Sequence, residues 1–272
     1  MNRPPEPTLP LSDRGLAYGD GLFETVLVRD GTPLLWSEHL ARLLKGCRVL
    51  DLPPPRTEAL ASALAGAGPG LGVLKLVYTR GSGGRGYAPP ASSDPRLEAL
   101  WSSFAPDQQR WAAGVRVRRC RLRLARQPVL AGIKHLARLE NVLARAEWRD
   151  PDIAEGLLED DRGQLVEATA MNVFFLARGA EQVSTPPLDQ CGVAGTLRAA
   201  LLEQGAVVEA PLLADELSSC EALWLGNSVQ GVWPVARLDD SEGQPQHGWE
   251  LSDVHRAFQH RAHRLLGYAG AD

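Results

Sequence analysis

Lysine amines are scarce in this chain, so any chemistry that needs one has few candidates. The 29 basic residues include only three lysines, Lys45, Lys75 and Lys134. Lys45 is expected on the solvated flank of a helix, and Lys75 on the polar face of a half-buried strand. Lys134 lies between the apolar segment 128–133 and an expected helix over 136–148. A lysine at such a junction can point into a cleft, where desolvation lowers its pKa and makes the amine a nucleophile.

Two glycine-rich segments are candidates for binding anionic groups. Gly192–Gly195 precedes an expected helix over 196–204, and backbone N–H groups at a helix start attract phosphate. Taken alone, this segment is more simply a tight turn. Gly81–Gly86 has neither the lysine of a nucleotide-binding loop nor the strand–turn–helix context of a dinucleotide fingerprint. We expect a mobile loop that presents Arg85 and Tyr87 to a carboxylate, with a purely structural loop as the alternative.

Other common chemistries lack the residue patterns that they need. The four cysteines never form a C-x-x-C pair, no carboxylate completes a metal pattern with the histidines of the C-terminal helix, and Gly-x-Ser-x-Gly does not occur. We therefore expect no metal site and no serine nucleophile, and we expect the cysteines to be small buried residues in a reducing compartment. Neither the N-terminal segment nor any other run is apolar enough for a signal peptide or a membrane span. This predicts a cytoplasmic protein without a membrane partner.

Arginines alternate with apolar residues along an expected strand over 115–124. The alternation slips between Arg118 and Arg119, as a β-bulge would produce. Such a stripe, extended to Arg126, could belong to a non-catalytic protein that binds nucleic acid or another acidic partner. No aromatic residues are interleaved with it, and the chain has a net charge of −4. A solvated sheet face is therefore favoured, without a nucleic-acid partner.

Hydrophobic periodicity predicts an α+β chain with two lobes. The polar stretch 106–110 marks the expected boundary, which gives lobes of residues 1–108 and 109–272. A cleft between two lobes is the default place for a ligand site. The expected strands are 22–28, 73–78, 97–104, 115–124, 156–160, 165–167, 172–176 and 221–225. The further expected helices are 37–50, with Ser37 as its N-cap, 57–65 and 252–266.

Several segments, taken in order, resemble the fold-type IV pyridoxal-phosphate enzymes. They are Tyr18–Thr25, Glu38–Leu43, Lys134, Leu165–Glu167 with Asn172, Gly192–Arg198 and Asn227–Val235. This family includes branched-chain and D-amino-acid aminotransferases and the aminodeoxychorismate lyases. Thr79–Tyr87 and Leu130–Glu140 resemble the segments of the lyases in particular. The resemblance implies a smaller N-terminal α/β sandwich lobe and a larger C-terminal lobe with a β-barrel-like sheet, which carries the lysine.

The resemblance also implies a role for each matching residue. Lys134 would hold pyridoxal 5'-phosphate as a Schiff base in the cleft between the lobes and remove the proton from the carbon that bears the substrate amine. Glu167 would meet the pyridine nitrogen and keep it protonated. Arg42 would bind the phosphate. The other residues implied at the cofactor are Thr196, Leu197, Asn227 and Ser228.

The implied reaction converts 4-amino-4-deoxychorismate into 4-aminobenzoate and pyruvate, a step of folate biosynthesis, in a homodimer. Thr25 would donate a proton to the leaving group, although threonine is also an ordinary strand residue. Arg85 and Tyr87 are the candidates for the substrate carboxylates. The alternative is a D-amino-acid or branched-chain aminotransferase, which would need an oxo-acid acceptor.

Overall fold

The computed structural model describes residues 8–268, which form two compact units. Unit 1 ends at Ala105 and also includes the short segment Ile133–Ala137, and unit 2 comprises the rest. The boundary expected from the sequence lies at residue 108, and Lys134 was expected with the C-terminal lobe. The segment Ile133–Ala137, which contains Lys134, groups with unit 1 because it pairs with strand β1 through an isolated bridge between His135 and Leu22. Residues 1–7, which hold part of the N-terminal segment expected to lack a signal peptide, are outside the described range.

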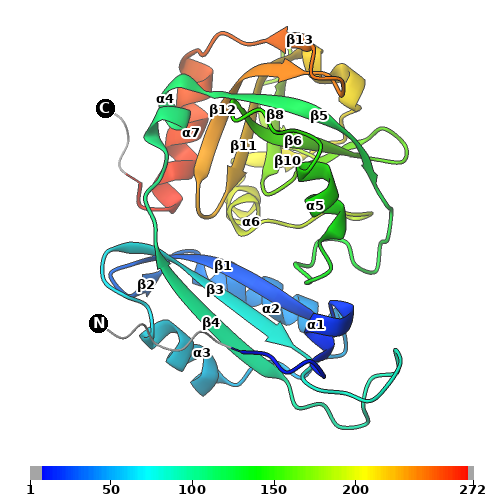
Figure 1. The fold of residues 1–272 in the computed structure, drawn as a ribbon. Coiled ribbons are helices and arrows are strands. Elements are labelled where there is room, and N and C mark those ends of the chain that lie inside the picture. The colour runs from blue at the N-terminus through cyan, green and yellow to red at the C-terminus, as the bar shows by residue number, and fades with distance from the viewer. Residues whose placement is uncertain (1–7, 269–272) are drawn as a thin grey trace. The chain divides into compact units, whose positions relative to one another are not determined.

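Unit 1 is built on a four-stranded antiparallel sheet with helices packed against it (Figure 1). Its strands are β1 (Gly21–Arg29), β2 (Thr32–Pro33), β3 (Leu71–Thr79) and β4 (Arg96–Ser103), in the order β2-β1-β3-β4. Its helices are α1 (Arg14–Tyr18), α2 (Trp36–Val49) and α3 (Thr57–Ala65). Helix α2 packs so closely on β1 that a methyl group at Gly46 would come within 2.6 Å of the Leu22 side chain.

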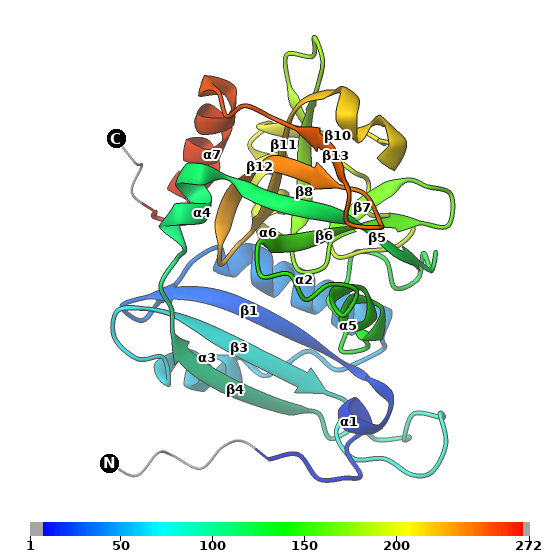
Figure 2. The ribbon, with the colours of Figure 1, turned by 45° about the horizontal axis from the view of Figure 1, so that its top comes forward.

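Unit 2 is built on a nine-stranded mixed sheet that curls strongly (Figure 2). Its strands are β5 (Val115–Leu124), β6 (Ile153–Asp160), β7 (Leu165–Ala168), β8 (Asn172–Ala177), β9 (Val183–Thr185), β10 (Val207–Glu209), β11 (Cys220–Asn227), β12 (Gly231–Asp239) and β13 (Pro245–Gly248). The order is β10-β9-β8-β11-β12-β5-β6-β7, with β13 beside β12. The helices are α4 (Gln108–Ala113), α5 (Leu139–Arg145), the 3-10 helix η1 (Ala214–Ser219), α6 (Thr196–Glu203) and α7 (Asp253–Leu265).

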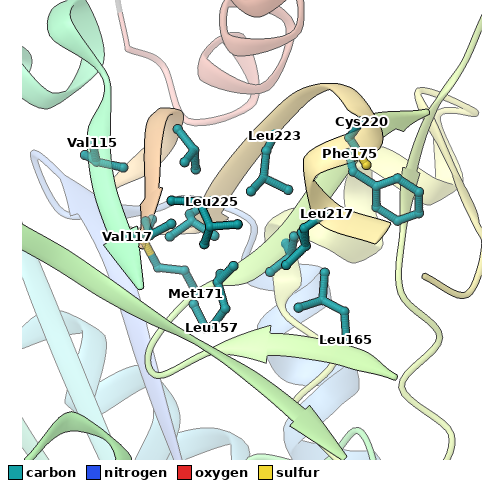
Figure 3. Packing of buried hydrophobic residues seen from close by; sticks show 14 of the residues in the cluster. Val115, Val117, Leu157, Leu165, Met171, Phe175, Leu217, Cys220, Leu223 and Leu225 are labelled. Carbon is teal, nitrogen blue, oxygen red and sulfur yellow. The ribbon is translucent and has the colours of Figure 1, made fainter. Parts of the chain in front are cut away.

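Alternate residues of neighbouring strands build the main core of unit 2. Leu223 and Leu225 on β11 pack with residues of β5 and with Leu217 of η1 (Figure 3). The residue between them, Trp224, points to the other face and packs against Phe258 of α7 with ring centroids 4.9 Å apart. Because both faces of this strand are covered, it reads in the sequence as a continuous apolar run rather than an alternating one.

Each expected helix and strand has a counterpart, but two details were wrong. Ser37 does not cap α2: the N-cap position is Leu35, with φ of 51°, and the Ser37 hydroxyl donates to Glu38 instead. The helix expected over 136–148 is only α5, Leu139–Arg145. It starts later because the preceding residues extend along β1, where Leu136 N donates to the Gly21 carbonyl at 3.0 Å.

The arginines of β5 are paired with acids, whereas the sequence suggested a solvated face. Strand β5 lies in the middle of the sheet, between β12 and β6. Neighbouring strands therefore place carboxylates beside it. Arg118 is buried, with its side chain 7% exposed. The pairing of β5 with β6 is irregular on either side of the slip expected between Arg118 and Arg119. The ion pairs are Arg116–Asp239, Arg119–Glu159, Arg123–Glu159 and Arg126–Asp160.

The four cysteines are buried, as expected, and all four are free. Burial raises the pKa of the Cys120 and Cys191 thiols to about 12, so these groups stay protonated and unreactive near neutral pH. Over residues 8–268, no helix has the length and apolar character that crossing a membrane requires.

Candidate active site

Lys134 lies along strand β1 and is fixed there by its backbone. The N–H of Phe23 donates to the Lys134 carbonyl at 3.0 Å, and the next residue, His135, bridges Leu22. The Lys134 ammonium nitrogen lies 4.4 Å from the centroid of the Phe23 ring, which is a cation–π contact. The amine therefore has a fixed backbone on both sides and an aromatic surface beside it.

A buried acid on the same strand holds two basic side chains of α2. The Glu24 carboxylate accepts from Arg42 Nε at 2.8 Å and from Arg42 Nη2 at 2.5 Å, and it lies 2.6 Å from His39 Nδ1. Burial raises the pKa of Glu24, but the charge and hydrogen bonds of Arg42 and the contact with His39 outweigh burial and lower it to about 2. Burial lowers the pKa of His39, although Glu24 opposes this. Glu24 is thus ionised at neutral pH, and it fixes the plane of the Arg42 guanidinium.

Arg85 and Tyr87 lie on an exposed loop that Arg14 of α1 holds in place. Arg14 donates to the carbonyls of Tyr87 at 2.8 Å and of Gly86 at 3.1 Å. Its guanidinium also lies over the Tyr18 ring at 4.9 Å, and Tyr18 meets Tyr87 edge to face at 5.4 Å. The loop therefore has a defined base, while the Tyr87 side chain is 84% exposed.

In unit 2, Glu167 and Asn172 hold the glycine-rich turn 192–195. The Glu167 carboxylate accepts from Val193 N at 2.9 Å. The Asn172 amide donates to the Val193 carbonyl at 2.9 Å and accepts from Gly195 N at 3.1 Å. A methyl group at Gly195 would come within 2.0 Å of Asn172 Oδ1, so this position requires glycine.

The turn leads directly into helix α6, whose first residues are Thr196 and Leu197. Both are buried, and the N-cap residue Gly195 has no side chain to satisfy the first N–H groups. The positive end of the helix dipole therefore lies next to the turn that Glu167 holds. In this unit the structure brings the expected carboxylate and the expected helix start together.

Asn227 and Ser228 form a second turn, between β11 and β12. The Asn227 side chain accepts from Val229 N at 2.9 Å and Gln230 N at 2.7 Å, and it donates to the Ala170 carbonyl at 3.2 Å. Ser228 is buried within this turn. The Asn227 amide thus ties the turn to the segment that joins Glu167 to Asn172.

Sequence reasoning assigned no role to several buried polar residues. Glu155 on β6 accepts from Thr169 N at 3.1 Å and from the Thr169 hydroxyl, and burial raises its pKa. Glu24 lies inside Tyr18–Thr25, a segment of the family resemblance, but neither Glu24 nor His39 was expected at the site. Glu24 and Glu155 each lie within a strand of mostly apolar residues, and this is the sequence signal that they share.

The chain is similar to known proteins over most of its length. The model of the amino-transferase class IV family matches residues 21–238. An aminodeoxychorismate lyase of Vibrio harveyi is 33% identical over 255 residues, which are 90% of this chain and 92% of that protein. The chain belongs to the amino-transferase class IV family.

Two further relatives of this class IV chain differ in the activity that their names give. The crystal structure of 4-amino-4-deoxychorismate lyase from Pseudomonas aeruginosa is 45% identical, with a TM-score of 0.85 and coverage of 96% of both chains. A putative branched-chain-amino-acid aminotransferase of Methanocaldococcus jannaschii is 30% identical over 240 residues, 84% of this chain and 81% of that one. The fold-type IV architecture expected from the resemblance is confirmed.

The site residues expected from the class IV resemblance are divided between the two units. Unit 1 carries the amine, the arginine on α2, the hydroxyl on β1 and the two residues of the exposed loop: Lys134, Arg42, Thr25, Arg85 and Tyr87. Unit 2 carries the carboxylate and the two turns: Glu167, Thr196, Leu197, Asn227 and Ser228.

Proposed function

We propose that the chain is a pyridoxal-phosphate-dependent lyase that converts 4-amino-4-deoxychorismate into 4-aminobenzoate and pyruvate. The observation that carries the proposal is the 45% identity with the Pseudomonas lyase over 96% of both chains. The Vibrio relative, whose name gives the same activity, supports it.

The donor set of this chain fits the cofactor. Three side chains suit three groups of the cofactor. The Lys134 amine, on its fixed backbone, suits the aldehyde, and the buried Glu167 carboxylate suits the pyridine nitrogen. The oriented Arg42 guanidinium suits the phosphate. The close packing at Gly195 keeps side chains away from the start of α6, where a phosphate binds well. When bound, the cofactor supplies an electron sink for the charge left when a proton leaves the substrate.

Lys134 is proposed to hold the cofactor through its amine. With the cofactor bound, the Lys134 amine would accept the proton from the carbon that bears the substrate amine. The Glu167 carboxylate keeps the ring nitrogen protonated, and Val193 N–H fixes that carboxylate. Arg42, the amides of Thr196 and Leu197 and the Ser228 hydroxyl bind the phosphate, and Asn227 holds the turn of Ser228 in shape.

Thr25 and the exposed loop are proposed to act on the rest of the substrate. The bond between the ring carbon and the ether oxygen breaks, and the expelled enol becomes pyruvate when it gains a proton. Thr25, on β1 two residues from Phe23, is the proposed donor of a proton to this leaving group. Arg85 and Tyr87 are proposed to bind carboxylates of the substrate, on a loop that Arg14 anchors.

An assay without an acceptor tests the lyase. The holoenzyme is mixed with aminodeoxychorismate and no oxo acid, and 4-aminobenzoate and pyruvate are followed separately. We expect the two products in equal amounts. Product that forms only when an oxo acid is added, or transamination of D-alanine or leucine with no 4-aminobenzoate, would contradict the proposal.

A second candidate function is transamination on the same fold. The 30% identity with the Methanocaldococcus putative aminotransferase favours it. A transaminase would leave the cofactor in its amino form after one half-reaction, whereas a lyase returns it unchanged. The absorption spectrum after a single turnover therefore separates the two.

A homodimer and a cytoplasmic location are further parts of the proposal. Helix α5 exposes Leu139, Val142 and Leu143, by 75%, 59% and 60%, and such an apolar patch is typical of an interface. The buried free cysteines support a reducing compartment. No nucleic-acid partner is proposed, because carboxylates neutralise the arginines of β5.

A further inference from the structure

Two aromatic side chains that are distant in the sequence hold the turn between β11 and β12. The Tyr268 hydroxyl donates to the Val229 carbonyl, across 39 residues of the chain. The Trp111 indole N–H donates to the Gln230 carbonyl at 2.8 Å, across 119 residues. The same turn carries Ser228, whose hydroxyl is proposed to bind the cofactor phosphate. Residues from both ends of unit 2 therefore contact one segment of the proposed site.

The peptide group between Val229 and Gln230 is fixed on both sides. Its carbonyl accepts from Tyr268, and its N–H donates to the Asn227 side chain at 2.7 Å. The carbonyl and the N–H of a trans peptide point in opposite directions, so the two bonds hold a planar group from opposite sides. The N–H of Val229 also donates to Asn227, at 2.9 Å. The backbone that follows Ser228 thus has a defined orientation.

Helix α7 places the Tyr268 ring against this turn. Beyond the end of the helix, Tyr268 N donates to the His263 carbonyl at 3.1 Å. The His263 ring accepts from Val232 N at 3.0 Å, and a methyl group at Gly231 would come within 2.6 Å of its Nε2. The rings of Trp111, His263 and Tyr268 pack together, with centroid separations of 4.4, 4.8 and 5.6 Å. The two donors are therefore part of one packed group of rings behind the turn.

We propose that Tyr268 and Trp111 are positioning residues for the phosphate of the cofactor. They act through the turn, because fixing the Val229 and Gln230 carbonyls fixes the direction of the Ser228 hydroxyl. A phosphate that meets donors already in place binds more tightly than one that must order the turn as it binds. The inference rests on the proposed function, in which Ser228 binds the phosphate.

The competing interpretation is that the rings only fill the space between α4, α7 and β12. Such packing would stabilise the fold whether or not the turn binds a phosphate. The two interpretations differ in the ligand whose binding is affected. Loss of positioning weakens the binding of pyridoxal 5'-phosphate more than that of pyridoxal, which has no phosphate, whereas loss of general stability weakens the binding of both alike.

The first test compares Tyr268→Phe, which removes the hydroxyl and keeps the ring, with Tyr78→Phe. The control is matched because the buried Tyr78 also donates its hydroxyl to a backbone carbonyl, that of Pro53 at 2.7 Å, in unit 1. Dissociation constants of pyridoxal 5'-phosphate and of pyridoxal are measured by titration into each apoprotein. The phosphorus NMR resonance of the bound cofactor and unfolding in urea are recorded alongside.

The second test compares Trp111→Phe with Trp249→Phe by the same measurements. Trp249 is the matched control because its indole N–H also donates to a backbone carbonyl of unit 2, that of Cys220 at 3.0 Å. The two pairs of variants remove different donors from the same turn. Each pair therefore checks the other if one substitution disturbs folding.

We expect Tyr268→Phe and Trp111→Phe each to lower the preference for pyridoxal 5'-phosphate over pyridoxal by about fivefold, the effect of one ordinary hydrogen bond. The phosphorus resonance should shift in both, and the two controls should keep the parental preference and resonance. A parental preference in either variant, or an equal weakening of both ligands, would overturn the role of that residue. A parent protein that does not prefer the phosphorylated ligand would instead remove the proposed phosphate site, and the inference with it. Neither ligand is turned over, so the result holds for a lyase and for a transaminase.

Discussion

Arg42 and Glu24 form a buried ion pair in which the carboxylate receives two hydrogen bonds from one guanidinium, from Nε and from Nη2. The Glu24 side chain is 2% exposed, and His39 is on its other side. A bidentate pair fixes the plane of the guanidinium as well as its position. The arginine proposed to bind phosphate is thus oriented before any ligand arrives.

Removing the charge of Glu24 should destabilise the protein in a pH-dependent way. The folded pKa of Glu24, about 2, is below its ordinary value of 4.5. A lowered carboxyl pKa contributes stability above pH 4.5 that is lost as the pH falls towards 2, about 3 kcal/mol for this shift. We expect Glu24→Gln to lower the free energy of unfolding near neutral pH by a comparable amount. Urea unfolding between pH 7 and pH 3 should then show a smaller slope for the variant, and parallel curves would contradict this.

His263 on α7 should give a second acid-sensitive window at higher pH. Its Nε2 accepts from Val232 N at 3.0 Å, which requires the neutral ring, and burial lowers its pKa from 6.5 to about 4. The stability that this contact contributes is present above pH 6.5 and is lost as the pH falls from 6.5 to 4. In His263→Gln the melting temperature should depend less on pH over this range than in the parent. His247→Gln is the control. The same decline in His263→Gln as in the parent would refute the assignment.

Local patterns were sufficient where periodicity is strong and were insufficient where distant segments meet. The bounds of α3, Thr57–Ala65, and β5, Val115–Leu124, were predicted to the residue. Helix α1 has five residues, too few for a periodic signal. Lys134 was predicted just before a helix over 136–148, but the residues that follow it pair with β1, so the helix begins only at Leu139.

The candidate site shows the same difference between what local patterns predict and what depends on contacts between distant segments. Composition and position made Lys134 one candidate among three lysines, and the family resemblance assigned it a role. The contact of Glu24 with Arg42, and that of Arg14 with the Tyr87 carbonyl 73 residues away, depend on how helices pack on strands. Periodicity contains no such information, because it reports which face is buried and not which residue is opposite.

Replacing Gly195 by alanine should impair cofactor binding. The added methyl group would come within 2.0 Å of Asn172 Oδ1 and force apart the turn that precedes α6. We expect the dissociation constant for pyridoxal phosphate, titrated into the apoprotein, to rise at least about tenfold, the effect of losing one or two good hydrogen bonds. Gly66→Ala is the control, because a methyl group there would lie 3.4 Å from its nearest neighbour. Equal affinities in the two variants would show that the turn does not bind the phosphate.

Lys134→Ala should abolish turnover while leaving the fold intact. Lys134 contacts β1 through its carbonyl, which alanine retains, so unfolding in urea should change little. The proposed covalent link and proton transfer both need the amine, and we expect the rate to fall by at least about a thousandfold. Mass spectrometry of the digested protein after borohydride treatment should locate the cofactor on the peptide of Lys134 in the parent and find no such adduct in the variant. Parental turnover in Lys134→Ala would overturn the mechanism.

Arg14 should control the substrate affinity through the loop that it anchors. Its guanidinium donates to the carbonyls of Gly86 and Tyr87, and it also pairs with Asp20. In Arg14→Gln the loop loses these bonds, so Arg85 and Tyr87 must be ordered at the expense of substrate binding. We expect a KM for aminodeoxychorismate about tenfold higher, with a smaller change in kcat, and faster proteolytic cleavage within residues 79–91. Arg149→Gln, at an exposed arginine of unit 2, is the control. Faster cleavage with an unchanged KM would mean that the loop does not contact the substrate, and this result would remove Arg85 and Tyr87 from the proposed site.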